Sequence, residues 1–346
     1  MNTCRQFCSR RFRMRVLILG FLLATWTLWR MDSPPVLLPP RLVAKSFLPC
    51  IEIRPGFGPY QEAVIKASGL YCIAEDFWQQ RLSDFAGHTG PAPYRHLLGV
   101  IANDVTVDMA NHTLHSDGHS SGIVAVRIDK EDEKPVAKNI TIRDGVLDIR
   151  GLGTAVEVID HWPMYSIDEP VPKNFPGFKK SGVVLDNLLI KTDNVGVILE
   201  GDGNIIRNCV IESGGDSAIM MAGPNGQILN NIIVLTDPLI PTWLANASEG
   251  YLYQYENLSK SRNNPRAAVT LHQANGTLIS GNRIEVKGKS TTRHNIYLTD
   301  ASIGVRVESN TIVGVDAPVV LMKDSTATLK NNVFEKRMKK PWWRLW

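Results

Sequence analysis

Short apolar runs recur along this chain at a spacing that no helical period explains. From residue 105 onward, one recurring element is an asparagine followed by two largely apolar or β-branched residues, at Asn187, Asn208, Asn231, Asn282, Asn310 and Asn332. A second element alternates apolar and polar positions, at 197–199, 219–221, 269–271, 296–298 and 319–321. Both elements advance in similar steps and share one long step of about 50 residues, which marks a repeat architecture.

Each repeat of roughly 22 residues has room for three short strands. Stacked about 4.8 Å apart, such units form a parallel β-helix whose inward positions are apolar. The pattern therefore predicts an all-β domain of about eight coils over residues 101–335. We expect the recurring asparagines to form a ladder at one corner, where each amide bonds the backbone and the asparagines of adjacent coils.

The asparagine repeat and turns such as Asn103-Asp104-Val105-Thr106-Val107-Asp108 resemble the right-handed parallel β-helix proteins of the pectate-lyase-like superfamily. The resemblance covers roughly residues 100–335, and the segment from Gly69 to Asp76 looks like the start of many such bacterial domains. It implies that residues 50–100 form an N-terminal cap, with a short helix over residues 60–67. It selects no activity, because the superfamily includes lyases, epimerases, hydrolases, binding modules and phage spikes.

The first 49 residues have the composition of a targeting segment. Six arginines and no acidic residue occur in 1–30, the uncharged run 16–29 follows five of these arginines, and a Pro-rich linker spans 31–49. Fourteen helical residues rise only ~21 Å, less than the ~30 Å of a hydrocarbon core. This predicts an export signal, either cleaved or retained as an inner-membrane anchor, and a periplasmic or exported protein. Cys50 and Cys72 could then form one disulfide, whereas Cys209 is expected in the core.

Charge is distributed unevenly between the ends and the body of the chain. The net charge is +4, but residues 31–335 hold 27 basic and 34 acidic side chains. An acidic body argues against a nucleic-acid partner. The basic, Trp-rich tail 336–346 could cap the far end of the stack or lie on an anionic membrane.

Candidate chemistry gathers on the outward positions of the second element. Polar residues stand there among apolar ones, at Arg127, Glu157, Glu200, His272 and Tyr297. That mixture is typical of a ligand groove, although a partly covered face would have the same composition. Arg293 and His294 lie nearby in sequence, and with Tyr297 they offer the arginine and base that β-elimination or epimerisation of a uronate requires.

Two acidic residues, Asp193 and Asp216, precede successive strands and should lie about one coil apart. Such a pair could serve as acid and base or hold Ca²⁺, or the two could be ordinary turn residues. The pair resembles polygalacturonase motifs, but Ser217 replaces the family's next aspartate and Ala267-Ala268 stands where its Gly-His-Gly is expected. These departures argue against hydrolysis of that type, and no cofactor is predicted.

The long insertion 236–266 is rich in aromatic residues, including Trp243, Tyr251, Tyr253 and Tyr255. These side chains could stack on sugar rings, pin the loop to the stack or contact a partner protein.

Two functional hypotheses follow. In the first, the chain is a cell-envelope carbohydrate-active protein, a lyase, epimerase or hydrolase that acts on a polysaccharide in a groove on one face. In the second, it is a non-catalytic glycan-binding or assembly module of a polysaccharide export system with envelope protein partners.

Overall fold

The computed structural model describes residues 49–55, 63–79, 96–118, 121–126, 138–151, 153–159, 177–237, 266–288, 293–299, 301–314, 317–322 and 324–336. All of them belong to the compact unit Pro40–Trp346, whereas the unit Met1–Pro39 lies outside the described residues. Across these stretches every named element is a β-strand, and no helix there has the length and hydropathy needed to cross a bilayer. The predicted signal or anchor at 16–29, the linker and the 336–346 tail beyond Lys336 stay predictions.

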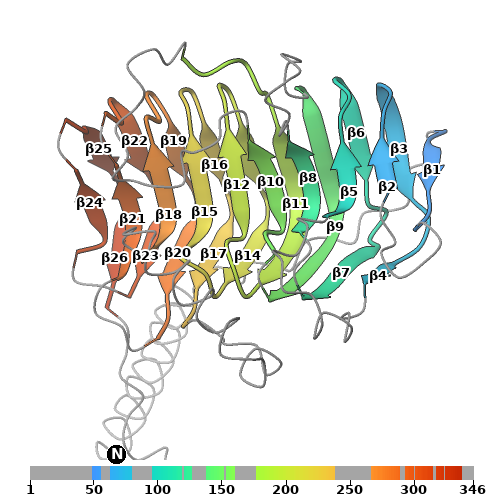
Figure 1. The fold of residues 1–346 in the computed structure, drawn as a ribbon. Helices are drawn as coiled ribbons and strands as arrows, with labels where there is room; N and C mark the ends of the chain where they lie inside the picture. Colours follow the sequence, from blue (N-terminus) through green and yellow to red (C-terminus); the bar gives the residue numbers. More distant parts are fainter. Residues whose placement is uncertain are drawn as a thin grey trace, which may run out of the picture. The chain divides into compact units, whose positions relative to one another are not determined.

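Three strands per coil build the stack, and all their pairings between coils are parallel (Figure 1). The first face contains β1 (Ile51–Ile53), β3 (Gly69–Ile73), β6 (Val105–Asp108), the first halves of β9 (Ile140–Gly151) and β11 (Val184–Thr192), β13 (Ile205–Arg207), β16 (Gln227–Leu229), β19 (Leu278–Ser280), β22 (Val305–Glu308) and β25 (Ala327–Lys330).

The second face contains β4 (Phe77–Gln79), β7 (Thr113–Gly118), the second halves of β9 and β11, β14 (Val210–Ser213), β17 (Ile232–Leu235), β20 (Arg283–Val286), β23 (Thr311–Val313) and β26 (Val333–Glu335). Because β9 and β11 run through both faces, the two faces join into one 17-stranded sheet.

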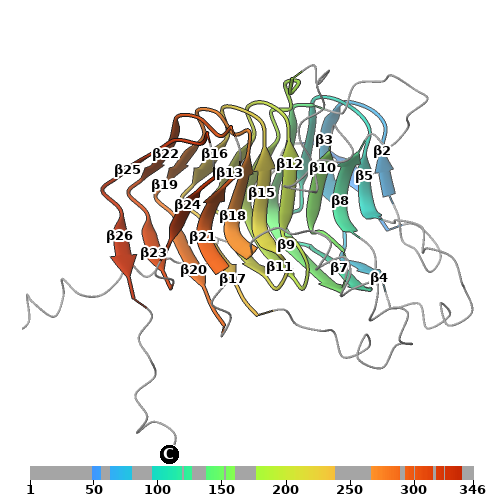
Figure 2. The ribbon, with the colours of Figure 1, turned by 60° about the vertical axis from the view of Figure 1, so that its left-hand side comes forward.

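The third face is a separate nine-stranded sheet (Figure 2). It contains β2 (Ala63–Ile65), β5 (His96–Val100), β8 (Ser121–Val126), β10 (Val156–Ile159), β12 (Val197–Glu200), β15 (Ser217–Ala222), β18 (Arg266–His272), β21 (Arg293–Leu298) and β24 (Val319–Leu321). The first face has ten strands and this sheet has nine, so the described residues form nine to ten coils, compared with about eight predicted.

The stack begins earlier than the predicted boundary at residue 101. β2 pairs with β5, and β3 pairs with β6, so strands of the segment 50–100 already belong to the coils. The short helix expected over 60–67 is wrong, because β2 occupies Ala63–Ile65. A three-residue strand is too short to show the alternation that distinguishes it from one helical turn. Cys50 and Cys72 form the expected disulfide and link the first two coils.

The asparagine ladder is present, but four of the six predicted residues form it. Asn231 Nδ2 donates to Asn282 Oδ1 at 2.9 Å, Asn282 Nδ2 to Asn310 Oδ1 at 2.9 Å, and Asn310 Nδ2 to Asn332 Oδ1 at 3.0 Å. The backbone N–H groups of Asn231, Asn282 and Asn310 also donate to the side-chain oxygen of the asparagine on the following coil. The ladder therefore satisfies polar groups at a buried corner, as expected.

Asn187 and Asn208 lie one position ahead of this ladder. Their φ values are 53° and 55°, and their amides donate to Asp144 and Asp186 rather than to a column of asparagines. The register places Asn208 level with Asn230, so that Cys209 takes the ladder position on its coil and donates its N–H to Asn231 Oδ1. A left-handed position favours asparagine as well as glycine, which is why the two columns look alike in sequence.

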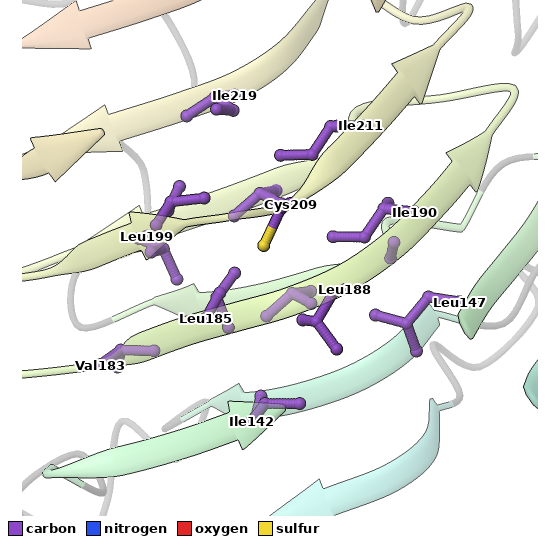
Figure 3. Packing of buried hydrophobic residues seen from close by; sticks show 14 of the residues in the cluster. Ile142, Leu147, Val183, Leu185, Leu188, Ile190, Leu199, Cys209, Ile211 and Ile219 are labelled. Atoms are coloured by element: carbon purple, nitrogen blue, oxygen red, sulfur yellow. The ribbon is translucent and has the colours of Figure 1, made fainter. Parts of the chain in front are cut away.

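Cys209 is buried in the core, as predicted, among side chains from several strands (Figure 3). Burial raises the pKa of its thiol to about 12, although backbone hydrogen bonds act in the opposite direction. We expect iodoacetamide at pH 8 to leave Cys209 of the folded protein unmodified and to alkylate it after unfolding in urea, as read by peptide mass spectrometry. Rapid alkylation of Cys209 in the folded state would contradict this packing.

The inward column of the nine-stranded sheet offers a matched test of burial. Leu298 is fully buried, whereas Leu321, its partner on the last coil, is 45% exposed. Leu298→Ala should lower the free energy of unfolding by about 3 kcal/mol, since the cavity adds to the lost transfer energy. Leu321→Ala should cost about 1 kcal/mol, because less apolar area leaves the core. Equal losses in urea unfolding would show that the last coil is covered.

Candidate functional site

The outer face of the nine-stranded sheet carries the residues expected to form a groove. One outward row runs through Glu157, Ile198, Met220, Thr270, Tyr297 and Val320 in directly paired positions. A neighbouring row runs through Glu200, Ala222 and His272. The structure thus brings Glu157, Glu200, His272 and Tyr297 onto one face, because outward positions alternate with core positions along each strand.

The outward register expected for Arg127 is wrong by one residue. Val124 pairs with Glu157, and Val126, rather than Arg127, pairs with Ile159. Coil lengths vary here, and a one-residue shift exchanges inward and outward positions. Arg127 itself lies outside the described residues.

This face is covered rather than open between β10 and β21. Glu157, Glu200, Thr270 and Tyr297 are each less than 9% exposed. Beside them, Ile159, Val195, Ile198 and Met220 form a small apolar cluster separate from the core inside the coils. The predicted mixture of polar and apolar side chains is therefore present, in the form of a covered face.

His272 and Tyr297 have defined neighbours at the end of this face. His272 Nδ1 lies 2.6 Å from Thr299 Oγ1. The rings of His294 and Tyr297 stack with centroids 5.8 Å apart, and His294 Nδ1 lies 3.4 Å from the carbonyl oxygen of Ala317. The main chain of Arg293 pairs with that of Arg266 in β18, and the side chain of Arg293 lies outside the description.

A buried hydroxyl pair on the same sheet was not anticipated from the sequence. Ser217 Oγ lies 2.7 Å from Thr270 Oγ1, and both residues are buried. In the sequence, Ser217 stands out only as a departure from the polygalacturonase pattern. Its bond to Thr270 depends on the pairing of β15 with β18 across the long insertion, which sequence spacing does not reveal.

The side chain of Asp193 bonds to residues of the preceding coil. Its carboxylate accepts hydrogen bonds from Arg150 Nη1 at 3.3 Å and from the N–H of Gly151 at 3.1 Å, and its side chain is 6% exposed. Burial by itself lowers the pKa of Arg150, but the charges of Asp148 and Asp193 outweigh that effect and raise it. This bonding favours the turn-residue interpretation of Asp193 over the acid–base pair with Asp216.

Asp216 contributes its main-chain oxygen to the N–H of Ala267. In the part of the chain that the structure describes, no group of three or more His, Cys, Asp or Glu side chains is arranged to hold a metal ion. The loop aromatics Trp243, Tyr251, Tyr253 and Tyr255 fall outside the described residues, so their predicted role in substrate binding stays a prediction.

Sequence reasoning also missed a cluster on the second face. Trp78, His115 and Asp148 lie level with one another on β4, β7 and β9. The cap expected over residues 50–100 leaves Trp78 outside the predicted coils. The alternation Phe77-Trp78-Gln79, with its buried, exposed and buried positions, is the local signal that could have revealed it.

Comparison with known proteins adds a family match. Residues 178–341 match the family model described as "Right handed beta helix region". None of the curated proteins matches the chain.

Among solved structures, the chain is similar to full-length tailspike protein 2 of the Escherichia coli O157:H7 bacteriophage CAB120, with 10% identity over 78% of this chain and 31% of that one, at a TM-score of 0.45. The enzymatically active domain of bacteriophage CBA120 tailspike protein 2 gives 11% identity over 79% and 37%, at a TM-score of 0.43. This chain therefore spans about a third of each tailspike.

The family match covers the later coils, and the parallel pairing between coils continues through the earlier ones. The chain has an all-β, right-handed parallel β-helix fold.

Proposed function

We propose that this chain is an exported carbohydrate-active protein that binds a polysaccharide at the outer face of the nine-stranded sheet and modifies it there. One observation carries the proposal. Glu200 and His272 occupy the same outward row two strands apart, with only the small side chain of Ala222 between them. Strands about 4.8 Å apart put their Cα atoms roughly 10 Å from each other, which suits an acid and a base on opposite sides of one sugar residue.

The hydrogen bond at His272 defines the role of its imidazole. The contact of Nδ1 with the Thr299 hydroxyl fixes the orientation of the ring, and the imidazole is the proposed proton-transfer group. Glu200 then supplies the carboxyl group, and Tyr297 on the adjacent row supplies an aromatic edge and a hydroxyl. This constellation is compatible with a lyase, an epimerase or a hydrolase.

The substrate class follows from charge. Residues 31–335 carry an excess of acidic side chains, which disfavours a polyanion unless the site is locally basic. A neutral or mildly acidic glycan is therefore proposed.

Export is supported by the Cys50–Cys72 disulfide, since such bonds persist in oxidising compartments. Together with the apolar run 16–29, it supports a periplasmic or exported protein, held at the inner membrane if that run is retained. Envelope protein partners belong to the same proposal.

The alternative is a non-catalytic glycan-binding or assembly module. Burial of Glu157, Glu200 and Tyr297 favours it, because an enzyme of a long polymer needs an open approach to its catalytic groups. The two hypotheses differ in what happens to a bound glycan.

A glycan-array screen of the full chain, followed by mass spectrometry of each bound sugar, separates them. A new product establishes an enzyme, and binding without conversion supports the module. The absence of any bound glycan would reject both hypotheses and would leave the stack as a protein-docking scaffold.

A further inference from the structure

The second face exposes a tryptophan at a position where most strands present polar side chains. Trp78 is 54% exposed, and it faces outward between the buried Phe77 and Gln79 of β4. A single exposed apolar side chain is common on protein surfaces, so the neighbours of Trp78 decide what it can bind. On the next coil its ring lies against His115, with centroids 4.6 Å apart and planes tilted by 40°.

Hydrogen-bonding groups continue the line that starts at Trp78. The register places Trp78, His115, Asp148 and Lys191 level with one another on four successive coils. We call this line the Trp78 row. Its members stand about 4.8 Å apart, a repeat close to the length of one hexopyranose residue in an extended glycan.

The polar members of the Trp78 row are held in place by their neighbours. His115 Nδ1 lies 3.0 Å from Asp148 Oδ2, and Arg150 Nε lies 2.7 Å from Asp148 Oδ1. Arg150 in turn contacts Asp193, which is anchored by Gly151. Side chains fixed in this way present hydrogen-bonding atoms without the entropic cost of ordering them on binding.

The chemistry of this surface selects one class of ligand. Asp148 and Asp193 are balanced by Arg150 and Lys191, so the cluster does not favour a polyanion or a polycation. A pyranose ring has an apolar face that fits an indole and equatorial hydroxyls that both donate and accept hydrogen bonds. Asp148, Arg150 and His115 remain partly exposed, with side chains 28%, 36% and 18% accessible, so they can reach such hydroxyls.

We propose that the Trp78 row is a second glycan-binding site for a neutral sugar chain, with Trp78 as the stacking platform and His115, Asp148 and Arg150 as hydroxyl partners. It lies on the 17-stranded sheet, whereas the site proposed above lies on the nine-stranded sheet, so neither depends on the other.

The test uses the full chain and an array of neutral and uronate-containing oligosaccharides, followed by calorimetric titration of the strongest binder. Trp78→Ala should weaken binding of a neutral glycan at least tenfold, while Trp78→Phe, which keeps a stacking ring, should stay within about threefold of the parent. His115→Ala should have an intermediate effect. Glu285→Gln, on the same face but several coils away, is the matched control and should change nothing.

The outcomes distinguish this site from the other one. Weaker glycan binding by Trp78→Ala, with unchanged binding by Tyr297→Ala, supports the Trp78 row. Weaker binding by Tyr297→Ala, with no effect of Trp78→Ala, overturns it and leaves the first site standing. Binding of uronate glycans only, or no bound glycan at all, also overturns it. Circular dichroism and the thermal midpoint of Trp78→Ala should match the parent, because the side chain packs outside the coils.

Discussion

Asn282→Ala should lower the free energy of unfolding by about 4 kcal/mol, one of the largest stability effects in the chain. The Asn282 amide donates to the Ile228 carbonyl at 2.8 Å and to Asn310, and its oxygen accepts from the N–H of Asn231 at 2.8 Å. At 2% exposure, water cannot replace these bonds. Alanine leaves at least two buried polar groups without partners, at about 1–3 kcal/mol each. Urea unfolding followed by circular dichroism measures the loss.

Asn332→Ala is the matched control at the end of the same ladder. Asn332 accepts from Asn310 and donates to the Val307 carbonyl, but it is only partly buried on the last coil. Solvent can satisfy the groups it leaves, so we expect a loss of about 1 kcal/mol. Equal effects of Asn282→Ala and Asn332→Ala would mean that the ladder contributes little beyond local turn structure.

Under the proposed function, Glu200→Gln should reduce turnover of the bound glycan by at least about 100-fold, the range expected for loss of a general acid or base. Glutamine keeps the size and hydrogen-bonding capacity of the side chain, so glycan affinity should change little. His272→Ala should cause a similar loss of turnover, since both groups act in one proton-transfer step. Product formation followed by mass spectrometry at saturating glycan gives the comparison.

Glu212→Gln is the control for this substitution. Glu212 is exposed on the second face, next to Lys191 of the Trp78 row, and it lies on the 17-stranded sheet rather than on the sheet of Glu200 and His272. It should leave turnover unchanged. If Glu200→Gln turned over the glycan as fast as Glu212→Gln, the row containing Glu200 and His272 would not be catalytic.

The repeat pattern predicted the fold because each coil must bury the same inward positions. Val197, Ile219, Val269 and Ile296 do lie in one buried column. The pattern assigns Asn208 to the wrong column, because two adjacent columns both favour asparagine. One column forms the amide ladder, and the other has a left-handed backbone. Only the pairing of β14 with β17 separates them.

The sequence predicts which residues share the candidate site, but it does not predict how deeply they are buried. Alternation alone puts Glu157, Glu200, His272 and Tyr297 on one outer face, as observed. Whether that face is open depends on what packs over it, and alternation along a strand contains no such information. The position of Trp78 is not predictable for a related reason. Its register with His115 depends on where the stack begins.

Hydrogen exchange of the full chain with and without its bound glycan tests the central claim most directly. The proposed function predicts slower exchange in peptides that cover β12, β15 and β18, the strands of Glu200, Ala222 and His272. Slowed exchange at β4 and β7 in addition would report the Trp78 row. Protection confined to β4 and β7, with β12, β15 and β18 unchanged, would contradict a polysaccharide site on the nine-stranded sheet.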